Sequence, residues 1–308
     1  MKQKIIITGA TGLIGSRLSA LLASKGYEII VFTRDIKKGK EKVPSASGFV
    51  EWDYHKPENW GNRLDGCYAV IHLAGVSIGG GRVNEKYKKK IVDSKINSTK
   101  NLVKAMSSVS SKPKVFLCPS GVNYYGDCGN DILTENASNG NDFLANLCIV
   151  WEKEAAKVEE FGIRRVSLRT SPVLSTKDGF LRRMLPFFKL YLGATLGNGK
   201  QWLSWIHPDD IAQIYLYALE NNFISGAINA TSPNPLRMEE FAKIFGKVLK
   251  RPALFTVPKF VISIIAGEAA NFITASLRVI PESLLNSGYS FKFPELRSAL
   301  ADIVENSK

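Results

Sequence analysis

Three glycines near the start of the chain have the spacing of a phosphate-binding turn. They are Gly9, Gly12 and Gly15 of KIIITGATGLIGSRLSALLASKG, and they lie between a strand-like run and a run with helical periodicity. Glycine reaches unusual backbone angles, and without a Cβ it lets a pyrophosphate approach the backbone. The helix that follows offers free N–H groups and the positive end of its dipole. A tight turn without a ligand is the alternative. The pattern predicts a dinucleotide site formed by Gly9, Thr11, Gly12, Leu13, Ile14 and Gly15.

The end of the second predicted strand indicates which dinucleotide would bind. Thr33 and Arg34 close this strand, and Arg34 lies 19 residues after Gly15. Sites for NAD place Asp or Glu near this point to hold the ribose 2′-hydroxyl, whereas a guanidinium suits a 2′-phosphate. The sequence therefore predicts NADP(H) as the cofactor. Asp35 is adjacent, however, and a shift of one residue would reverse the argument.

Further cofactor contacts are expected where other strands end. Asp53 follows the third strand and is placed to accept from an adenine amino group, with a plain strand-end turn as the alternative. Leu73, Ala74 and Gly75 close the fourth strand, where small residues would let a ribose pass close to the backbone. Lys95 lies on the long helix that follows. It either reaches the nicotinamide ribose or is one more solvated lysine.

Alternating strand and helix patterns must position these residues. Strands are predicted over 4–8, 28–34, 48–53, 67–75, 114–120 and 163–173, and the longest helices over 84–107 and 143–158. This order predicts an α/β fold with a doubly wound, Rossmann-like parallel sheet that is covered on both faces. We expect an NADP-binding domain over 1–178, with some later segments returning to the sheet. A smaller substrate lobe follows over 179–308, including a small helical domain at about 253–300.

Composition narrows the class of protein. The 308 residues carry a net charge of +13, but the charge is dispersed and no nucleic-acid motif is present, so neither a nucleic-acid nor a membrane partner is expected. The longest later apolar run, 260–267, is too short to span a bilayer. Cys67, Cys118, Cys128 and Cys148 lack CxxC spacing. They predict no metal site and free thiols in a reducing cytoplasm. Nothing in the sequence indicates an oligomeric state.

These motifs together resemble the extended type of the short-chain dehydrogenase/reductase superfamily. TGATGLIG, Arg34, Asp53 and HLAG carry the general likeness. One atypical branch, labelled epimerase-family or sugar-nucleotide epimerase proteins, is resembled further in YYGD, FLANLCIVWEKEA, RTSPVLS, GNGKQWLSWIHPDDIA and VIPESLLNSGYSFKFPEL. The resemblance covers nearly the whole chain. It implies an NADP(H)-dependent oxidoreductase or epimerase that acts on a small molecule, such as a sugar nucleotide or another carbonyl compound. It also implies that Val173 passes beside the nicotinamide.

The catalytic residues of the resembled superfamily do not carry over. Its chemistry rests on a Ser or Thr, a Tyr, and a Lys four residues after the Tyr. Counting back from Glu152 by the family spacing puts Leu144 at the Tyr position and Cys148 at the Lys position, and Gly121 falls at the Ser/Thr position. The standard mechanism is therefore not expected, and the catalytic residue is unknown. A regulatory protein that senses NADP(H) without catalysis is the alternative function.

Three other residues are candidates for proton transfer. Tyr124 and Tyr125 follow the fifth strand at the edge where ligands bind in open α/β folds, with aromatic packing as the alternative for each. His207 precedes an acidic helix start and has a side chain suited to acid or base work. A loop histidine that is hydrogen-bonded to the backbone is its alternative.

Overall fold

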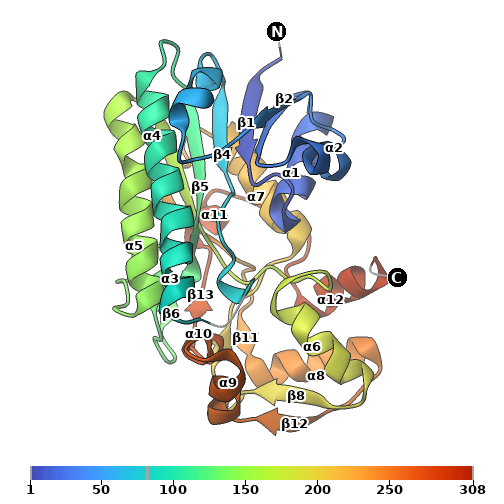
Figure 1. Cartoon of the computed structure of the whole chain (residues 1–308). Coiled ribbons are helices and arrows are strands. Elements are labelled where there is room, and N and C mark those ends of the chain that lie inside the picture. The colour runs from blue at the N-terminus through green and yellow to red at the C-terminus, as the bar shows by residue number, and fades with distance from the viewer. Residues whose placement is uncertain (1, 81–82, 307–308) are drawn as a thin grey trace.

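A seven-stranded parallel sheet forms the centre of the computed structural model, which describes residues 2–80 and 83–306 (Figure 1). The strand order is β10-β7-β5-β4-β1-β2-β3. This confirms the predicted doubly wound fold. The strands are β1 (Lys4–Thr8), β2 (Glu28–Thr33), β3 (Gly48–Glu51), β4 (Ala69–His72), β5 (Val115–Gly121), β7 (Arg164–Thr170) and β10 (Gly226–Ala230).

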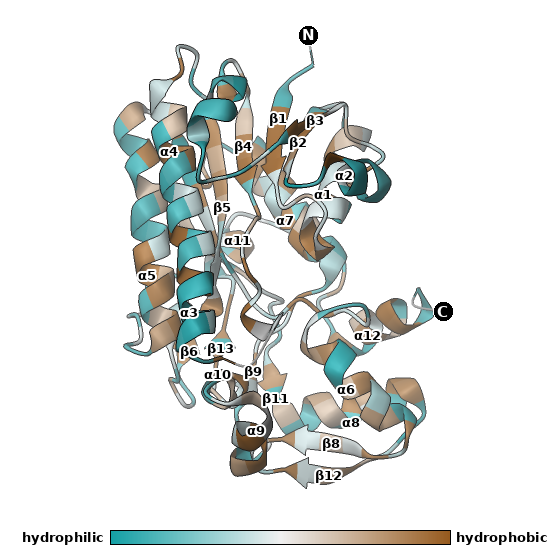
Figure 2. Ribbon diagram, in the orientation of Figure 1, coloured by the Kyte–Doolittle hydropathy of each residue, from teal (hydrophilic) through white to brown (hydrophobic). Residues whose placement is uncertain are grey.

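Helices cover both faces of the sheet because alternate strand residues point to opposite sides. Ile5 and Ile7 pack into the core shared with α1 (Leu13–Ser24) and α7 (Pro208–Glu220). Ile6 packs into the opposite core, with α4 (Ser98–Ser108) and the end of α5 (Phe143–Ala156). Figure 2 shows the apolar strands between these two helical layers. A strand that is buried on both faces must be apolar along its middle, as Ile5, Ile6 and Ile7 of KIIIT are.

The switch point of the sheet lies between β1 and β4. Strand β1 pairs with β2 on one side and with β4 on the other. The connection from β1 leads to β2 and the connection from β4 leads to β5, so the two run in opposite directions along the sheet. Thr8 lies opposite His72 in the register of the second pair. In open α/β sheets ligands bind in the crevice outside such a point. The glycine turn and the segment from Leu73 to Gly75 both begin there.

The long helix predicted over 84–107 is continuous but not uniform. It consists of α3 (Glu85–Val92), a π-helical segment (Asp93–Asn97) and α4. Asn84 starts it by accepting a hydrogen bond from the N–H of Tyr87. Isolated π-helical turns inside α-helices occur frequently at functional sites. The π-helical segment of this chain contains Lys95.

The smaller lobe has a core of its own, built largely from aromatic and aliphatic side chains such as Phe188, Phe241 and Phe245. Its main elements are α6 (Gly179–Lys189), β8 (Gly193–Leu196), α8 (Met238–Leu249), β12 (Ala253–Val257) and α12 (Leu296–Glu305). Strand β12 pairs with β8 in parallel. Within the helical domain expected at about 253–300, α9 (Lys259–Ala266) and α10 (Ala269–Ile273) are separate helices, because Gly267 between them has a φ of +62°.

Short elements complete the chain. Two small strand pairs join β6 (Ile132–Leu133) to β13 (Arg278–Val279) and β9 (Trp202–Leu203) to β11 (Leu236–Arg237). The remaining helices are α2 (Ile36–Lys42) and α11 (Glu282–Asn286). Single 3-10 turns span Pro57–Asn59, Gly61–Leu64, Ile78–Gly80, Val122–Tyr125 and Lys157–Phe161.

Segments beyond residue 178 contribute to both parts of the molecule. Helix α7 and strand β10 return to the sheet, while α6, β8 and α8 build the smaller lobe. The stretch 253–300 is likewise divided, because β12 joins the lobe and Leu284 of α11 packs into the sheet core. The domain division at residue 178 stays a prediction. Within the described ranges, no helix combines the length and apolarity needed to cross a membrane.

Candidate cofactor site

Two of the three turn glycines are required by the packing of the protein itself. A Cβ on Gly9 would lie 2.5 Å from the carbonyl carbon of Leu73 and 2.6 Å from the nitrogen of Ala74. Gly9 also has a φ of +69°, which disfavours other residues. A Cβ on Gly15 would lie 2.4 Å from the carbonyl oxygen of Gly9. These two glycines let α1 and the end of β4 approach the turn.

Gly12 differs from its neighbours. A Cβ there would meet only the carbonyl oxygen of Gly9, at 3.3 Å. Its backbone is extended, with φ −82° and ψ 177°, a conformation open to any residue. Gly12 starts α1, whose first turn has neither a side-chain cap nor an acidic residue. Internal packing therefore constrains Gly12 less than Gly9 and Gly15, and the start of the helix beside it has the features of a phosphate-binding position.

Hydrogen bonds through the side chains of Thr8 and His72 join the ends of β1 and β4 at the switch point. Thr8 Oγ1 accepts from the N–H groups of Leu73 (3.2 Å) and Ala74 (3.3 Å) and lies 2.7 Å from His72 Nδ1. His72 Nε2 lies 3.0 Å from Ser98 Oγ on α4. Burial lowers the pKa of His72 to about 3, so the ring is neutral, and it connects Thr8 of β1 to Ser98 of α4. Reasoning from the sequence missed this histidine.

Arg34 and Asp35 are the two residues that could face the ribose 2′ position, and Asp35 is the N-cap of α2. The Asp35 carboxylate accepts from the N–H of Lys38 at 3.0 Å and caps α2. Thr33 Oγ1 accepts from the N–H of Asp35 and fixes the turn. Arg34 is exposed and takes part in none of the ion pairs found within residues 2–80 and 83–306. The acidic residue is engaged in local structure, and the guanidinium is available.

Asp53 has the contacts of a strand-end turn. Its Oδ1 accepts from the N–H of His55 at 3.0 Å, and its carbonyl accepts from Trp60 Nε1 at 2.7 Å. The carboxylate is exposed. The turn therefore already orients the Asp53 carboxylate that would contact the adenine. The adenine contact itself stays a prediction.

Lys95 is placed quite unlike a solvated lysine. Its side chain is partly buried, and its Nζ lies 4.2 Å from the centre of the Trp151 ring. A Cβ on Gly75 would lie 3.1 Å from this nitrogen, so the ammonium sits at the end of β4. Burial lowers the pKa of Lys95 to about 8, and an interaction with Cys148 partly opposes that change. No ion pair or hydrogen bond of this ammonium is found among the described residues.

The two positions that lack the family's Tyr and Lys are buried in an apolar setting. Leu144 is 2% exposed and Cys148 is 5% exposed. Burial raises the pKa of Cys148 to about 11, so it is a neutral thiol near pH 7. A Cβ on Gly121 would lie 3.7 Å from Cys148 Sγ. The three positions therefore meet in space as the family spacing implies, but none holds a group suited to proton transfer.

A buried polar network lies next to them and was not found by sequence reasoning. Arg169 forms a bidentate ion pair with Glu152, at 2.9 Å for both Nε–Oε1 and Nη2–Oε2. Ser120 Oγ donates to the same carboxylate at 2.6 Å. Arg169 ends β7 and Ser120 lies in β5, so the pair links the sheet to α5. The sequence offered no signal beyond a charged residue in an apolar strand.

This network engages both candidate tyrosines. The Tyr125 hydroxyl donates to Asn229 Oδ1 at 2.7 Å and accepts from Arg169 Nη1 at 3.0 Å. Tyr125 is buried, and burial raises its pKa to about 12. These contacts favour the packing alternative for Tyr125. The Tyr124 ring lies 3.5 Å from the Arg169 guanidinium carbon, and this residue is only partly buried. Tyr124 thus keeps some access to solvent.

His207 has the contacts of its structural alternative. It caps α7, with Nδ1 accepting from the N–H of Asp209 at 3.1 Å. Nε2 faces Asp302 Oδ2 at 3.2 Å. Burial lowers the pKa of His207 to about 4, and the ring is 1% exposed. A neutral, enclosed ring with both nitrogens occupied is a helix cap. Elsewhere along the edge, Val173 bridges to Ile206 just beyond β7.

Metal ligands do not cluster in the ranges 2–80 and 83–306, where no three His, Cys, Asp or Glu side chains come together in a way that could hold an ion. All four cysteines are free, and Cys67, Cys118 and Cys148 are buried. The site is therefore an assembly of backbone, one free guanidinium and one partly buried ammonium.

Comparison with known proteins identifies relatives over the whole chain. The model of the NAD dependent epimerase/dehydratase family matches residues 5–230, and a domain of unknown function, DUF1731, matches residues 257–303. The chain is 35% identical to the epimerase family protein YfhF of Bacillus subtilis, over 99% of both chains. It is 33% identical to the human epimerase family protein SDR39U1, over 98% of this chain and all of that one. The predicted resemblance is confirmed.

Solved structures agree with this result. The crystal structure of human SDR39U1 (isoform 2) with NADPH has a TM-score of 0.87 and 31% identity, covering 99% of this chain and 100% of that one. UDP-glucuronic acid 4-epimerase from Bacillus cereus, in complex with UDP-glucuronic acid and NAD, has a TM-score of 0.76 and 19% identity, covering 99% and 100%. The second likeness establishes a shared fold.

Proposed function

The chain belongs to the NAD dependent epimerase/dehydratase family, and from this premise we propose that it binds NADP(H) and acts as an oxidoreductase or epimerase on a small molecule. The observation that carries the proposal is the glycine turn with Gly12 at the uncapped start of α1, beside the switch point of the sheet. A pyrophosphate fits there because it needs both backbone N–H groups and room. The human relative was solved with NADPH.

The remaining predicted contacts extend from this point along the carboxyl edge of the sheet. Arg34 would hold the 2′-phosphate, while the backbone of Leu73, Ala74 and Gly75 would line the ribose. Lys95, beside Gly75, would face the nicotinamide end. When bound, NADPH would supply a hydride, and the chain would orient it and control the proton.

We expect NADPH to bind more tightly than NADH, because only NADPH has a 2′-phosphate for Arg34. Arg34→Ala should weaken NADPH binding by about 1.5–3 kcal/mol, the usual value of a hydrogen bond to a charged group, and leave NADH binding unchanged. Isothermal titration calorimetry of both nucleotides measures this. Arg297→Ala, at an exposed arginine of α12, is the matched control. Equal affinities of the unmutated protein for the two nucleotides would rule out the proposed specificity.

The position of Lys95 predicts that the affinity for NADPH depends on pH. Its ammonium favours the bound cofactor, so affinity should be full below pH 8 and decline as the pH rises through the pKa of about 8. Two neighbours do not titrate in this window, because burial lowers the pKa of His72 to about 3 and raises that of Cys148 to about 11. Asp93, two residues before Lys95, has a lowered pKa because Asn97 and Tyr54 donate hydrogen bonds to it, and Glu152 is paired with Arg169.

Lys95→Met should remove the pH dependence and weaken NADPH binding at pH 7 by about 1–3 kcal/mol. Lys100→Met, at an exposed lysine on the same helix, should change neither property. Titrations of NADPH between pH 7 and about 9.5, a range that spans the lowered pKa of Lys95 of about 8, provide the measurement. A flat profile for the unmutated protein would assign Lys95 to packing against Trp151 alone.

The substrate is proposed only as a class. A sugar nucleotide or another carbonyl compound suits the family, and the Bacillus cereus neighbour was solved with UDP-glucuronic acid. Leu144 has no proton to transfer and the buried Cys148 thiol, with its pKa raised to about 11, holds its proton tightly, so we propose Tyr124 and Lys95 as the proton donors at this edge. The buried apolar character of positions 144 and 148 also favours the second candidate, a binding protein that senses NADP(H). Turnover of NADPH with a carbonyl panel separates the two. We also propose a cytoplasmic location, which the four free thiols suit.

A further inference from the structure

One end of the smaller lobe exposes large apolar side chains from segments that are distant in the sequence. We call this surface, residues 187–192 and 250–255, the lobe tip. The segments meet because β12 pairs with β8 and because Arg251 stacks on the Tyr191 ring at 4.3 Å. The exposed fractions are 58% for Phe187, 68% for Leu190, 55% for Tyr191, 50% for Leu192, 75% for Leu254 and 50% for Phe255. Apolar side chains gathered in this way usually mark an interaction site.

Both turns of the lobe tip are held in a costly backbone conformation. Tyr191 has a φ of +63° and Lys250 a φ of +56°. They are the two non-glycine residues with positive φ in the part of the chain that the structure describes. Such a conformation is uncommon for a bulky side chain. The fold thus presents Leu190, Tyr191 and Leu192 outward at some conformational expense.

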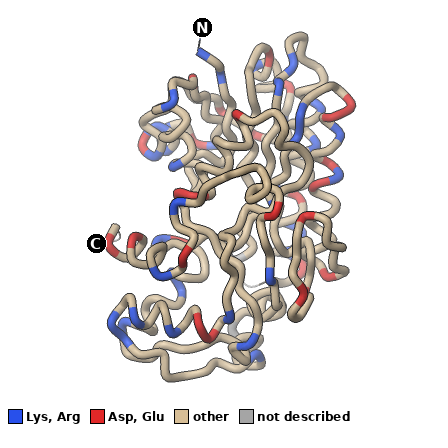
Figure 3. The backbone as a smooth tube through the Cα atoms, turned by 180° about the vertical axis from the view of Figure 1, so that it is seen from behind, with Lys and Arg blue, Asp and Glu red and all other residues tan. Residues whose placement is uncertain are grey.

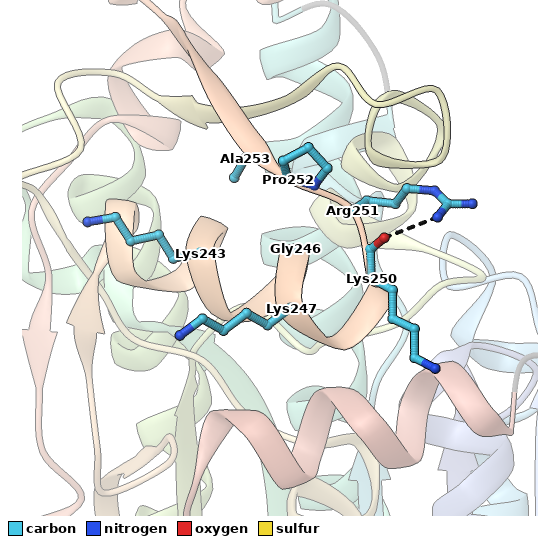
Figure 4. A pocket seen from close by; sticks show the side chains of 7 residues that line it. All are labelled: Lys243, Gly246, Lys247, Lys250, Arg251, Pro252 and Ala253. Atoms are coloured by element: carbon cyan, nitrogen blue, oxygen red, sulfur yellow. Dashed lines mark hydrogen bonds between the residues drawn. The ribbon is translucent and has the colours of Figure 1, made fainter.

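The lobe tip is bordered by basic residues. Lys243, Lys247 and Lys250 of the α8 end surround a hollow that continues into the chain from Arg251 to Ala253 (Figure 4). The lobe tip itself contains Lys189, Lys250 and Arg251 and no Asp or Glu. Figure 3 shows Lys and Arg gathered at this corner of the lobe. An apolar centre with a basic border is the result.

We propose that the lobe tip docks on the surface of an anionic lipid bilayer. Apolar side chains would enter the boundary between headgroups and acyl chains, while the basic border would attract anionic headgroups. Helix α9 extends the same character, with Phe260 67% and Ile264 70% exposed beside Lys259. The inference is independent of the proposed cofactor chemistry.

Charge decides between this partner and others. A second copy of the chain docked through the same face would bring two basic borders together, and Glu239, which lies 3.9 Å from Lys243, would offset only part of this charge. A nucleic acid would match the charge but would leave Leu190 and Leu254 against phosphates. The sequence predicted no membrane partner because no single apolar run is long enough to span a bilayer. The proposal departs from that expectation, because the lobe tip is assembled from segments about 60 residues apart that meet only in the fold.

The experiment is sedimentation of the full chain with vesicles of two compositions. One is phosphatidylcholine alone, and the other is phosphatidylcholine with an equal amount of phosphatidylglycerol. We expect binding to the anionic vesicles, which weakens as the ionic strength rises. The pair Leu190→Ser and Leu254→Ser should lower the partition coefficient at least about tenfold, since each leucine would otherwise be buried. Phe223→Ser, at a 65% exposed phenylalanine outside the lobe tip, is the control.

If thermal melting shows that the serine variants do not fold, two charge-reversal double variants provide the test instead. Lys189→Glu with Lys247→Glu should abolish the preference for anionic vesicles, whereas Lys100→Glu with Lys153→Glu on the sheet helices should not. Failure of the unmutated protein to bind anionic vesicles at low ionic strength would overturn the proposal. So would a lipid-independent dimer that the Leu190 and Leu254 changes dissociate, because a second copy would then be the occupant.

Discussion

Gly12→Val should lose NADPH binding by more than about a hundredfold and keep its fold. A branched side chain at this position would fill the space that a pyrophosphate needs beside the start of α1. The fold should remain, at a cost in stability, because the backbone of Gly12 is extended and a Cβ there would make one tight contact, with the Gly9 carbonyl oxygen at 3.3 Å. Calorimetry with NADPH measures the loss, and thermal melting checks that the fold remains.

The neighbouring glycines supply matched controls. Gly15→Ala should destabilise the protein itself, since its Cβ would lie 2.4 Å from the Gly9 carbonyl oxygen. Gly26→Ala, at the end of α1, has open space around its Cβ but a φ of +89°, so it should cost about 1 kcal/mol of stability and leave binding unchanged. A folded Gly12→Val protein that binds NADPH at full strength would reduce the motif to a turn.

The sheet and the order of its helices could be predicted from short-range patterns. Each strand is a brief β-branched run, and each covering helix carries an apolar stripe with the helical period. KIIIT is apolar on both faces because both cores use it, through Ile5 and Ile7 on one side and Ile6 on the other. The glycine turn was equally visible, since its chemistry depends on residues only three apart.

Features set by distant contacts could not be predicted in this way. Asp35 and Arg34 are equally plausible next to a ribose until the α2 cap engages the carboxylate. Lys95 looks like any helix lysine until the π-helical segment and Trp151 place it at the end of β4. His72 is a lone histidine in an apolar strand, and its role depends on Thr8, 64 positions away. Sequence spacing carries none of these contacts.

The Glu152–Arg169 pair should be the largest single electrostatic contribution to stability near the site. Both side chains are largely buried, with exposures of 12% and 6%. Burial alone would lower the pKa of Arg169, but the hydrogen bonds and charge of Glu152 raise it above its ordinary value. The guanidinium therefore stays charged and depends on the carboxylate. Removing one partner of a buried ion pair typically costs about 3–5 kcal/mol, because the other charge is left uncompensated.

Glu152→Gln should accordingly lower the free energy of unfolding by about 3 kcal/mol, measured by urea denaturation. Glu154→Gln is the control on the same helix, because its pair with the exposed Lys157 should contribute less than about 1 kcal/mol. The double variant Glu152→Gln and Arg169→Met should recover part of the loss, since no buried charge then remains unpaired. If Glu152→Gln is as stable as Glu154→Gln, the network does not hold β7 to α5. In that case the Arg169 guanidinium would keep its place beside the Tyr124 ring without the Glu152 carboxylate.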